Sequence, residues 1–367
     1  MTEVAFVLGT ESEAVRLAPV IRACERRGVD HAVIHTGEHG AETLERSVFD
    51  GFDVPSPDIA LDVGSGPHGR QTGTMLAAIE RALAETDPAV AVVHGDRNSA
   101  LAGAVAASKM RPKVAHVEAG LRSFDRSAPA ETNRVIADHV ADYLFATTEK
   151  ARWYLVREGV TELRITVTGS TAVDALERVR DRSRPEREVL DEFGLRAGGF
   201  LLVDVRRRGN ADDPGRFRAV LDGAARAGSA HGLEVVRPVR PRARERSGEV
   251  VPDGPAPVRT VEPRRYAAFV RLLSASAAVV TDSSCVQEEA CILGTPCVTV
   301  QNATERSETT EVGANRLGAR DPDGVCRSVT EALESDGEWE NPYGTVGAAE
   351  RVLGALPVDA ERGEIVR

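Results

Sequence analysis

Lysine is nearly absent from this chain of 367 residues, which contains only Lys109, Lys113 and Lys150. The positive charge therefore comes almost entirely from arginine, and acidic residues outweigh it to give a formal net charge of −11. Sequence-independent binding of nucleic acid depends mainly on lysine and arginine neutralising phosphates. The charge balance therefore predicts no nucleic acid among the partners of this protein.

Paired cysteines and long apolar runs are also missing. The five cysteines include no C-x-x-C pair, and their odd number does not suit a disulfide framework. No run of eighteen or more apolar residues occurs, and the start, MTEVAFVLGTESEAV, lacks the basic flank of a signal peptide. The sequence therefore predicts a reduced, cytoplasmic protein with no membrane partner.

Short apolar runs alternate with helical patterns in both halves of the chain. Strand-like runs occur at 4–8, 32–35, 89–93, 114–117, 143–146 and 165–167, and again at 200–205, 233–236, 258–260, 278–281 and 297–300. This alternation predicts parallel sheets with helices on both faces. We expect an N-terminal doubly wound lobe over 1–172, a C-terminal one over 173–340, and a helix and tail over 341–367 that packs back on the first lobe.

The segment GSGPHG, 64–69, has the spelling of the dinucleotide fingerprint G-x-G-x-x-G. That fingerprint works when it follows the first strand of a βαβ unit and opens its helix. Here the match follows DVPSPDIALDV and contains a proline, so we interpret it as a glycine-rich loop. A nicotinamide cofactor is not expected.

Two carboxylates follow neighbouring strand-like runs. VVHGD places Asp96 after the run at 89–93, and HVEAG places Glu118 at the end of the next run. Open α/β sheets bind ligands at the carboxyl ends of their strands, and paired carboxylates suit acid–base chemistry. An N-cap for a helix beginning near Ser99 explains Asp96 equally well from this segment alone. Likewise, the charges of HVEAGLRSFDRSAPAETNR suit either a solvated turn or a site for a charged substrate.

The segment TDSSCVQEEACILG, 281–294, is the strongest signal in the second half. An apolar strand ends, Ser283 and Ser284 form a turn, and a helix follows whose first N–H groups can bind phosphate oxygens. An ordinary capped helix is the alternative. Glu289 is then placed to accept ribose hydroxyls, and Arg306 to reach a phosphate. Together with the carboxylates, this pattern indicates a nucleotide sugar.

The chain resembles the non-hydrolysing UDP-N-acetylglucosamine 2-epimerases. The likeness runs from GTESEAVRLAPVI to NPYGTVGAAERVL, with the intermediate landmarks HTGEH, VHGDRNSALAG, HVEAGLRSFDR, ETNRVIADH, VTGSTAVDAL, DSSCVQEEACILG and ATERSE in the order of the family. An ordered series over nearly the whole chain is more specific than any one motif.

The resemblance implies a GT-B arrangement of two Rossmann-like lobes with the site in the cleft between them, a UDP-sugar substrate, no cofactor and a homodimer. It implies inversion at the second carbon of the sugar by elimination and re-addition of UDP, in cell-surface or glycan synthesis. The implied catalytic residues are Asp96, Glu118, Glu131, Arg134 and His39. The implied substrate-binding residues are Gly9, Thr10, Arg16, Ser283, Ser284, Cys285, Glu289 and Arg306.

Several positions depart from the family pattern. The family has an arginine near the phosphates where this chain has Glu11, and a carboxylate where it has Ala130, for which Glu131 is a candidate substitute. Two family histidines are replaced by Arg206 and Arg240. Two interpretations therefore stay open: an active epimerase, or a relative that binds a nucleotide sugar, or partners an active homologue, without turnover. A GT-B glycosyltransferase shares the fold but lacks support from these motifs.

Overall fold

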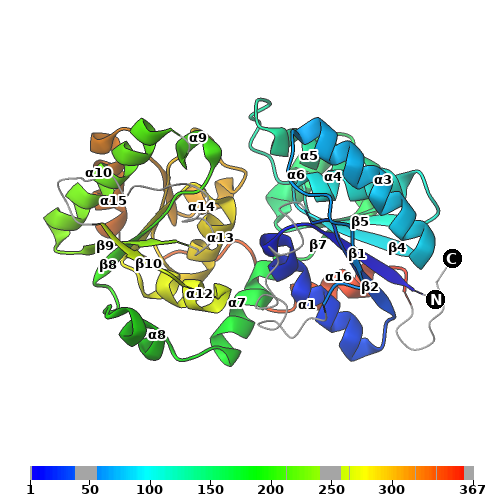
Figure 1. Ribbon diagram of the computed structural model, residues 1–367, viewed down its shortest axis with the longest axis horizontal. Coiled ribbons are helices and arrows are strands. Elements are labelled where there is room, and N and C mark those ends of the chain that lie inside the picture. The colour runs from blue at the N-terminus through cyan, green and yellow to red at the C-terminus, as the bar shows by residue number, and fades with distance from the viewer. Residues whose placement is uncertain are drawn as a thin grey trace. The chain divides into compact units, whose positions relative to one another are not determined.

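The computed structural model describes residues 2–37, 56–211, 213–239, 258–263, 265–318, 320–335 and 337–358. By its internal contacts the chain divides into two compact units (Figure 1). The first unit comprises Met1–Arg178 together with Tyr343–Arg367, and the second comprises Val179–Pro342. Each unit is built around its own parallel sheet.

The described part of the first unit contains a sheet of seven parallel strands in the order β3-β2-β1-β4-β5-β6-β7. The strands are β1 (Val4–Leu8), β2 (His31–His35), β3 (Ile59–Ala60), β4 (Val90–His94), β5 (Lys113–Ala119), β6 (Tyr143–Ala146) and β7 (Ile165–Val167). Every residue of β1 and β4 is buried, as expected for central strands covered on both faces.

Helices cover both faces of this sheet (Figure 1). The helices of this unit are α1 (Glu11–Arg27), α3 (His68–Thr86), α4 (Asn98–Ser108), α5 (Pro129–Val140), α6 (Glu149–Arg157) and α16 (Ala348–Ala355), with a 3₁₀ turn at Glu162–Arg164. The boundary between the two units falls after Arg178, within α7 (Thr171–Arg182). The first helix follows directly from its sequence, because Thr10 and Glu13 form a capping box at its start and Gly28 ends it in the left-handed conformation. The C-terminal helix α16 packs on α1, where Glu350 Oε2 pairs with Arg27 Nη2 at 2.7 Å.

The described part of the second unit contains a sheet of six parallel strands in the order β10-β9-β8-β11-β12-β13. The strands are β8 (Phe200–Asp204), β9 (Glu234–Pro238), β10 (Val258–Val261), β11 (Ala278–Thr281), β12 (Cys297–Thr299) and β13 (Asn315–Leu317). The helices are α8 (Glu186–Phe193), α9 (Arg208–Ala211), α10 (Pro214–His231), α12 (Tyr266–Ala275), α13 (Ser284–Leu293), α14 (Ser307–Glu311) and α15 (Pro322–Leu333).

Two apolar cores cover the two faces of the second sheet. One packs α10 and α15 against Leu201 and Val203 of β8. The other packs α8, α12 and α13 against Phe200 and Leu202 of the same strand. Alternate residues of one strand thus face opposite cores, which is the side-chain period of a β-strand.

The predicted fold class is confirmed, because both units have parallel sheets with the strand order of a Rossmann fold. The predicted site in the cleft between the lobes depends on their relative placement and stays a prediction. One local interpretation is wrong: α3 begins at His68, so the last residues of GSGPHG form the first turn of a helix and not a loop. Within the described residues, no helix is both long and apolar enough to cross a membrane.

Candidate active site

The predicted site residues lie at the carboxyl ends of central strands. In the first unit, Gly9 and Thr10 follow β1, Asp96 follows β4 and Glu118 lies near the end of β5. The order of the sheet reverses between β1 and β4, and ligands of open α/β sheets bind at such a point. The topology therefore brings these residues to the same edge of the first sheet.

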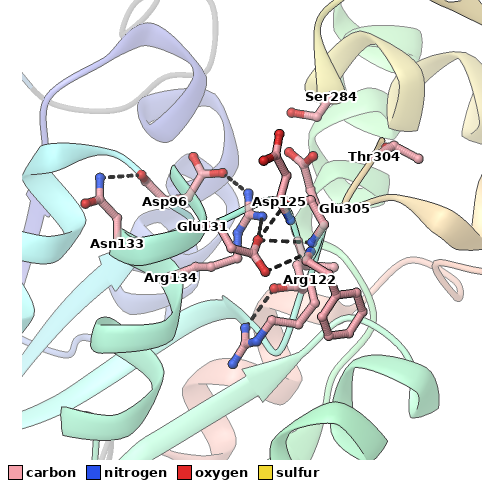
Figure 2. Close-up of polar contacts among 12 residues, drawn as sticks. Asp96, Arg122, Asp125, Glu131, Asn133, Arg134, Ser284, Thr304 and Glu305 are labelled. Carbon is pink, nitrogen blue, oxygen red and sulfur yellow. Dashed lines mark hydrogen bonds and ion pairs between the residues drawn. The ribbon is translucent and has the colours of Figure 1, made fainter. Parts of the chain in front are cut away.

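The carboxylate of Asp96 pairs with Arg134 (Figure 2). The N-cap of α4 is Arg97, whose side chain makes no capping hydrogen bond. The N-cap explanation for Asp96 is therefore wrong. The turn is also held through its backbone, because Asn133 Nδ2 donates to Asp96 O at 2.9 Å.

The carboxylate of Glu118 is buried and lies beside a histidine. Glu118 is 5% exposed, and its Oε1 is 3.3 Å from His94 Nε2. Its φ of 65° places it in the left-handed region, at the point where the pairing of β5 with β6 shifts its register. Such a backbone is unfavourable for glutamate and clusters at functional sites. The strained backbone distinguishes Glu118 from an ordinary strand-end residue.

Glu131 anchors the loop between β5 and α5 (Figure 2). One of its oxygens accepts from the N–H and hydroxyl of Ser123, at 3.0 and 2.8 Å, and the other accepts from the N–H of Phe124 at 2.9 Å. Arg134 Nη1 donates to the same carboxylate at 2.6 Å. Both oxygens are thus committed to the loop and to Arg134. A proton-transfer role for Glu131 stays a prediction.

The solvated-turn explanation fails for four charged residues of HVEAGLRSFDRSAPAETNR. Asp125 and Arg126 are exposed, as that explanation requires. The other charged side chains are at most 5% exposed, and these are Glu118, Arg122, Glu131 and Arg134.

The start of α1 is held by Glu13. Its Oε2 accepts from Gly9 N at 3.1 Å and from Thr10 N at 2.8 Å, and its Oε1 accepts from Ser99 Oγ at 2.6 Å. The sequence predicts that Gly9 and Thr10 bind substrate, and in the structure their backbone N–H groups donate to a side chain of α1. Arg16, another expected ligand, is 1% exposed. His39 and Arg240 lie outside the described residues.

A buried charged cluster lies behind the Asp96 turn. Asp138 accepts from His116 Nδ1 at 2.7 Å and from Arg122 Nη1 at 2.6 Å, while Arg122 also forms a two-pronged pair with Glu158 at 2.8 and 2.6 Å. Burial alone would raise the pKa of Asp138, but the charges and hydrogen bonds of His116 and Arg122 outweigh it and hold that pKa below its usual range. Neither Asp138 nor His116 was predicted from the sequence to belong to the site.

The glycine after β5 is required by this cluster and by a close approach of α6. Gly120 has a φ of 84°, and its N–H donates to Asp138 Oδ2 at 3.2 Å. A Cβ at this position would lie 2.4 Å from the carbonyl oxygen of Ala151. No other residue type fits both the backbone angle and the space.

In the second unit, Asp282 organises the loop that follows β8. Its carboxylate accepts from the N–H groups of Arg206 and Arg207, at 2.9 and 3.0 Å, and from Asn210 Nδ2 at 3.0 Å. This places Arg207 Nη2 3.4 Å from Ser284 Oγ, at the first turn of α13. The arginine loop therefore lies beside the helix start that the sequence predicts to bind phosphate.

The start of α13 was predicted to be either an ordinary capped helix or a site for phosphate oxygens. Ser283 is the N-cap and its side chain accepts from Val286 N, as in an ordinary capped helix. Ser284 and Cys285 occupy the first helical positions, whose N–H groups have no partner within a helix and suit an anion. The ordinary cap is confirmed, and binding of an anion at this turn stays a prediction.

The two other predicted ligands of the second unit are both buried. Arg306 is 3% exposed, and its Nη2 lies 3.1 Å from Glu288 Oε2. Glu289 Oε1 accepts from the hydroxyl of Tyr266 at 2.7 Å. Arg306 therefore has a buried counter-charge within its own unit.

Arg206, which replaces a family histidine, forms an ion pair with Asp204 at the end of β8. Burial raises the pKa of Asp204 above its usual range, although the charge of Arg206 opposes this effect. The guanidinium of Arg206 also lies over the ring of Phe269, 5.6 Å from its centroid. The side chain of Arg206 stays 46% exposed at this edge of the second sheet.

The opposite pKa shifts of Asp138 and Asp204 predict unequal losses of stability from the same substitution. Asp138→Asn should lower the free energy of unfolding at neutral pH by about 3 to 5 kcal/mol, because it removes the buried negative charge that His116 and Arg122 share. The lowered pKa means that this loss shrinks as pH falls below the unfolded value of about 3.9. Asp204→Asn should cost less, because the fold already disfavours that charge.

Urea unfolding of both variants and the wild type, at neutral and at acid pH, tests this contrast. For Asp204 the raised pKa means that its charge opposes folding at neutral pH and that this opposition is lost in acid. Equal losses for the two variants, with the same pH dependence, would contradict the assigned shifts.

The side chains of the two units can perform acid–base chemistry on an anionic substrate. The first unit supplies two carboxylates, each beside a basic side chain, and the second supplies a helix start flanked by arginine. Across the described residues, no group of three or more histidine, cysteine or acidic side chains is arranged to hold a metal ion.

Comparison with known proteins identifies the family. The profile described as UDP-N-acetylglucosamine 2-epimerase matches residues 22–357. A protein of that name from Methanocaldococcus jannaschii is 38% identical over 361 residues, which cover 96% of this chain and 98% of the relative. A relative from Pseudomonas aeruginosa, named UDP-2,3-diacetamido-2,3-dideoxy-D-glucuronate 2-epimerase, is 34% identical over 357 residues, covering 94% and 97% of the two chains.

Solved structures agree with this result. The crystal structure of the Methanocaldococcus jannaschii UDP-GlcNAc 2-epimerase in complex with UDP-GlcNAc and UDP has a TM-score of 0.88 at 38% identity, covering 96% of this chain and 98% of that one. The likeness confirms a GT-B-like fold with two Rossmann-like lobes. The chain belongs to the UDP-N-acetylglucosamine 2-epimerase family, a family of isomerases.

Proposed function

We propose that this protein is a UDP-N-acetylglucosamine 2-epimerase that interconverts UDP-GlcNAc and UDP-ManNAc. The observation that carries the proposal is the pair of carboxylates, Asp96 and Glu118, that consecutive strands deliver to one edge of the first sheet. Family membership and the names of the relatives support the substrate. The first unit is proposed to act on the sugar, and the second to bind UDP.

The proposed reaction begins with removal of the proton from the second carbon of the sugar. The electron pair of that C–H bond forms a double bond to the first carbon, whose bond to the UDP oxygen breaks, giving UDP and a glycal. Addition of UDP and delivery of a proton to the opposite face complete the inversion.

Glu118 is assigned the first proton transfer, because its carboxylate is buried at the carboxyl end of β5 and its Oε1 lies 3.3 Å from His94 Nε2. Asp96 is assigned to the other face of the reacting carbon, with Arg134 holding its orientation. Both assignments follow from general acid–base catalysis, which needs a positioned donor and acceptor. Glu131 and His39 remain further proposed members of this site.

In the second unit, the first turn of α13 is proposed to bind the diphosphate through the backbone of Ser283, Ser284 and Cys285. Arg207 supplies a long, positively charged side chain beside that turn. Glu289 is proposed to accept ribose hydroxyls, and Arg306 remains a proposed phosphate ligand. Gly9, Thr10 and Arg16 are the proposed substrate-binding residues of the first unit.

Arg207→Ala should weaken UDP binding about tenfold, because hydrogen bonds to charged groups contribute about 1.5 to 3 kcal/mol and this side chain is only half buried. Isothermal titration calorimetry with UDP measures the change. Arg226→Ala is the matched control, since Arg226 is a half-exposed arginine of the same unit that pairs with Asp323. Equal affinities for the two variants would remove Arg207 from the phosphate site.

The direct test is conversion of UDP-GlcNAc, followed by proton NMR of the anomeric signals. Formation of UDP-ManNAc supports the proposal. UDP binding without product would favour the alternative of a relative that binds a nucleotide sugar without turnover. The substrate of the Pseudomonas aeruginosa relative belongs in the same assay, because turnover of that sugar alone would correct the substrate. A homodimer, a cytoplasmic location and a role in cell-surface or glycan synthesis stay proposals.

A further inference from the structure

The ring of His116 lies between two hydrogen-bond acceptors. Its Nδ1 is 2.7 Å from Asp138 Oδ1, and its Nε2 is 2.8 Å from the carbonyl oxygen of Gly95. Both His116 and Asp138 are fully buried. Neither contact is explained by the chemistry proposed above, in which His116 takes no part.

A neutral imidazole donates from one nitrogen and accepts at the other. The carbonyl of Gly95 can only accept, so Nε2 must carry a proton. Asp138 can donate to Nδ1 only if it is itself protonated, but both of its oxygens already receive other donors: Arg122 Nη1 at 2.6 Å and Gly120 N at 3.2 Å on Oδ2, and Gly120 N at 3.4 Å on Oδ1. A carboxylate that receives so many donors is ionised, so Nδ1 must also carry a proton.

Charge balance agrees with this assignment. The charged groups that contact one another around His116 are Arg122, Asp138 and Glu158, the last paired with Arg122 at 2.6 Å. With His116 positive, two cations face two anions, which satisfies the requirement that buried charges be paired. With His116 neutral, the cluster would carry an excess negative charge.

We infer that His116 is a buried imidazolium that positions the catalytic Gly95–Asp96 turn, with Asp138 as its counter-ion. The turn is held from three sides: Gly95 O accepts from His116 Nε2, Gly95 N donates to Val117 O at 3.0 Å, and Asp96 O accepts from Asn133. Because these backbone groups are held, the direction in which the Asp96 side chain leaves the turn is also held. Preorganisation of this kind matters because small displacements of a reacting group cost large factors in rate. Only the catalytic role of the Gly95–Asp96 turn rests on the proposed function. The charge of His116 and its hold on the turn do not.

The protonation state can be measured without turnover. In protein labelled with ¹⁵N at histidine, both ring nitrogens of His116 should give the signals of protonated nitrogen at neutral pH. His116→Gln identifies those signals by their loss, and exposed His139 on α5 provides reference signals in the same spectrum. A signal of unprotonated nitrogen from His116 in the folded wild type would overturn the inference.

The positioning role has its own readout. His116→Leu removes the donor to Gly95 O and should speed amide hydrogen exchange at Gly95 by about tenfold or more, while His116→Gln, which keeps a neutral donor, should recover part of the protection. His139→Leu, at an exposed position, should leave it unchanged. Unchanged protection of Gly95 in both His116 variants would contradict the positioning role.

Turnover adds a third measurement that separates this inference from the proposed function. In an active enzyme, His116→Gln should lower kcat by about tenfold or more with KM nearly unchanged, because the group acts through the turn and does not bind substrate. A wild type that lacks turnover would contradict the proposed function, while the ring signals and amide exchange would still decide the role of His116.

Discussion

Glu118→Gln is expected to lower the rate of proton exchange at the second carbon of the sugar by about 10²- to 10⁴-fold, the range that general acid–base groups contribute. Glutamine keeps the shape of the side chain and removes its ability to accept the proton. Glutamine has the same size as glutamate and the site is buried, so the geometry should survive the change. Isotope exchange measured by NMR at saturating UDP-GlcNAc gives the rate.

Glu149→Gln is the matched control for this variant. Glu149 lies in the same unit, at the start of α6, with its side chain 75% exposed. The Glu149→Gln variant should catalyse proton exchange at the second carbon of the sugar at the wild-type rate. UDP affinity should be unchanged in both variants. Retention of the wild-type rate by Glu118→Gln would remove Glu118 from the proton transfer and leave Asp96 as the candidate base.

The second large effect is expected for stability. Arg306→Leu should lower the free energy of unfolding of the second unit by about 3 to 5 kcal/mol, because it leaves the carboxylate of Glu288 buried without its counter-charge. Native proteins have only about 5 to 15 kcal/mol of stability in total, so this loss is large. Urea unfolding followed by circular dichroism measures it.

The double variant Arg306→Leu with Glu288→Leu should recover most of this loss, because replacing both members of a buried pair by apolar groups is close to neutral. The UDP affinity of the refolded double variant then tests the other role proposed for Arg306, which is to bind a phosphate of UDP. As a proposed phosphate ligand, Arg306 should leave UDP affinity more than about tenfold lower when it is removed. Affinity within about tenfold of the wild type would limit Arg306 to its pair with Glu288, and failure of the double variant to recover stability would contradict the buried pair.

Much of the fold could be predicted because its strands are short apolar runs between helical patterns. The ranges predicted for β1, β6, β7 and β11 agree with the structure residue for residue. The strands β3 and β13 were not predicted, because β3 has only two residues and β13 begins with Asn315 and Arg316, so neither forms an apolar run. Both lie at the outer edges of their sheets, where pairing with one neighbour determines the strand.

The site was predictable where it follows from strand ends. Asp96 and Glu118 could be placed at one edge because each directly follows a buried run. The cluster of His116 and Asp138 could not, because its members are 22 residues apart and only the packing of α5 against β5 brings them together. The burial of Arg306 against Glu288 depends likewise on tertiary contacts between α13 and α14.

Deuterium incorporation at the second carbon of the sugar tests the central claim most directly. The wild-type protein is incubated with UDP-GlcNAc in deuterated water, and the position of deuterium is read by NMR, with UDP binding measured on the same sample. We predict deuterium at the second carbon of both epimers, because the proton that leaves and the proton that returns exchange with solvent. Binding of UDP with no deuterium at that carbon would contradict the account and show a protein that binds a nucleotide sugar without turnover.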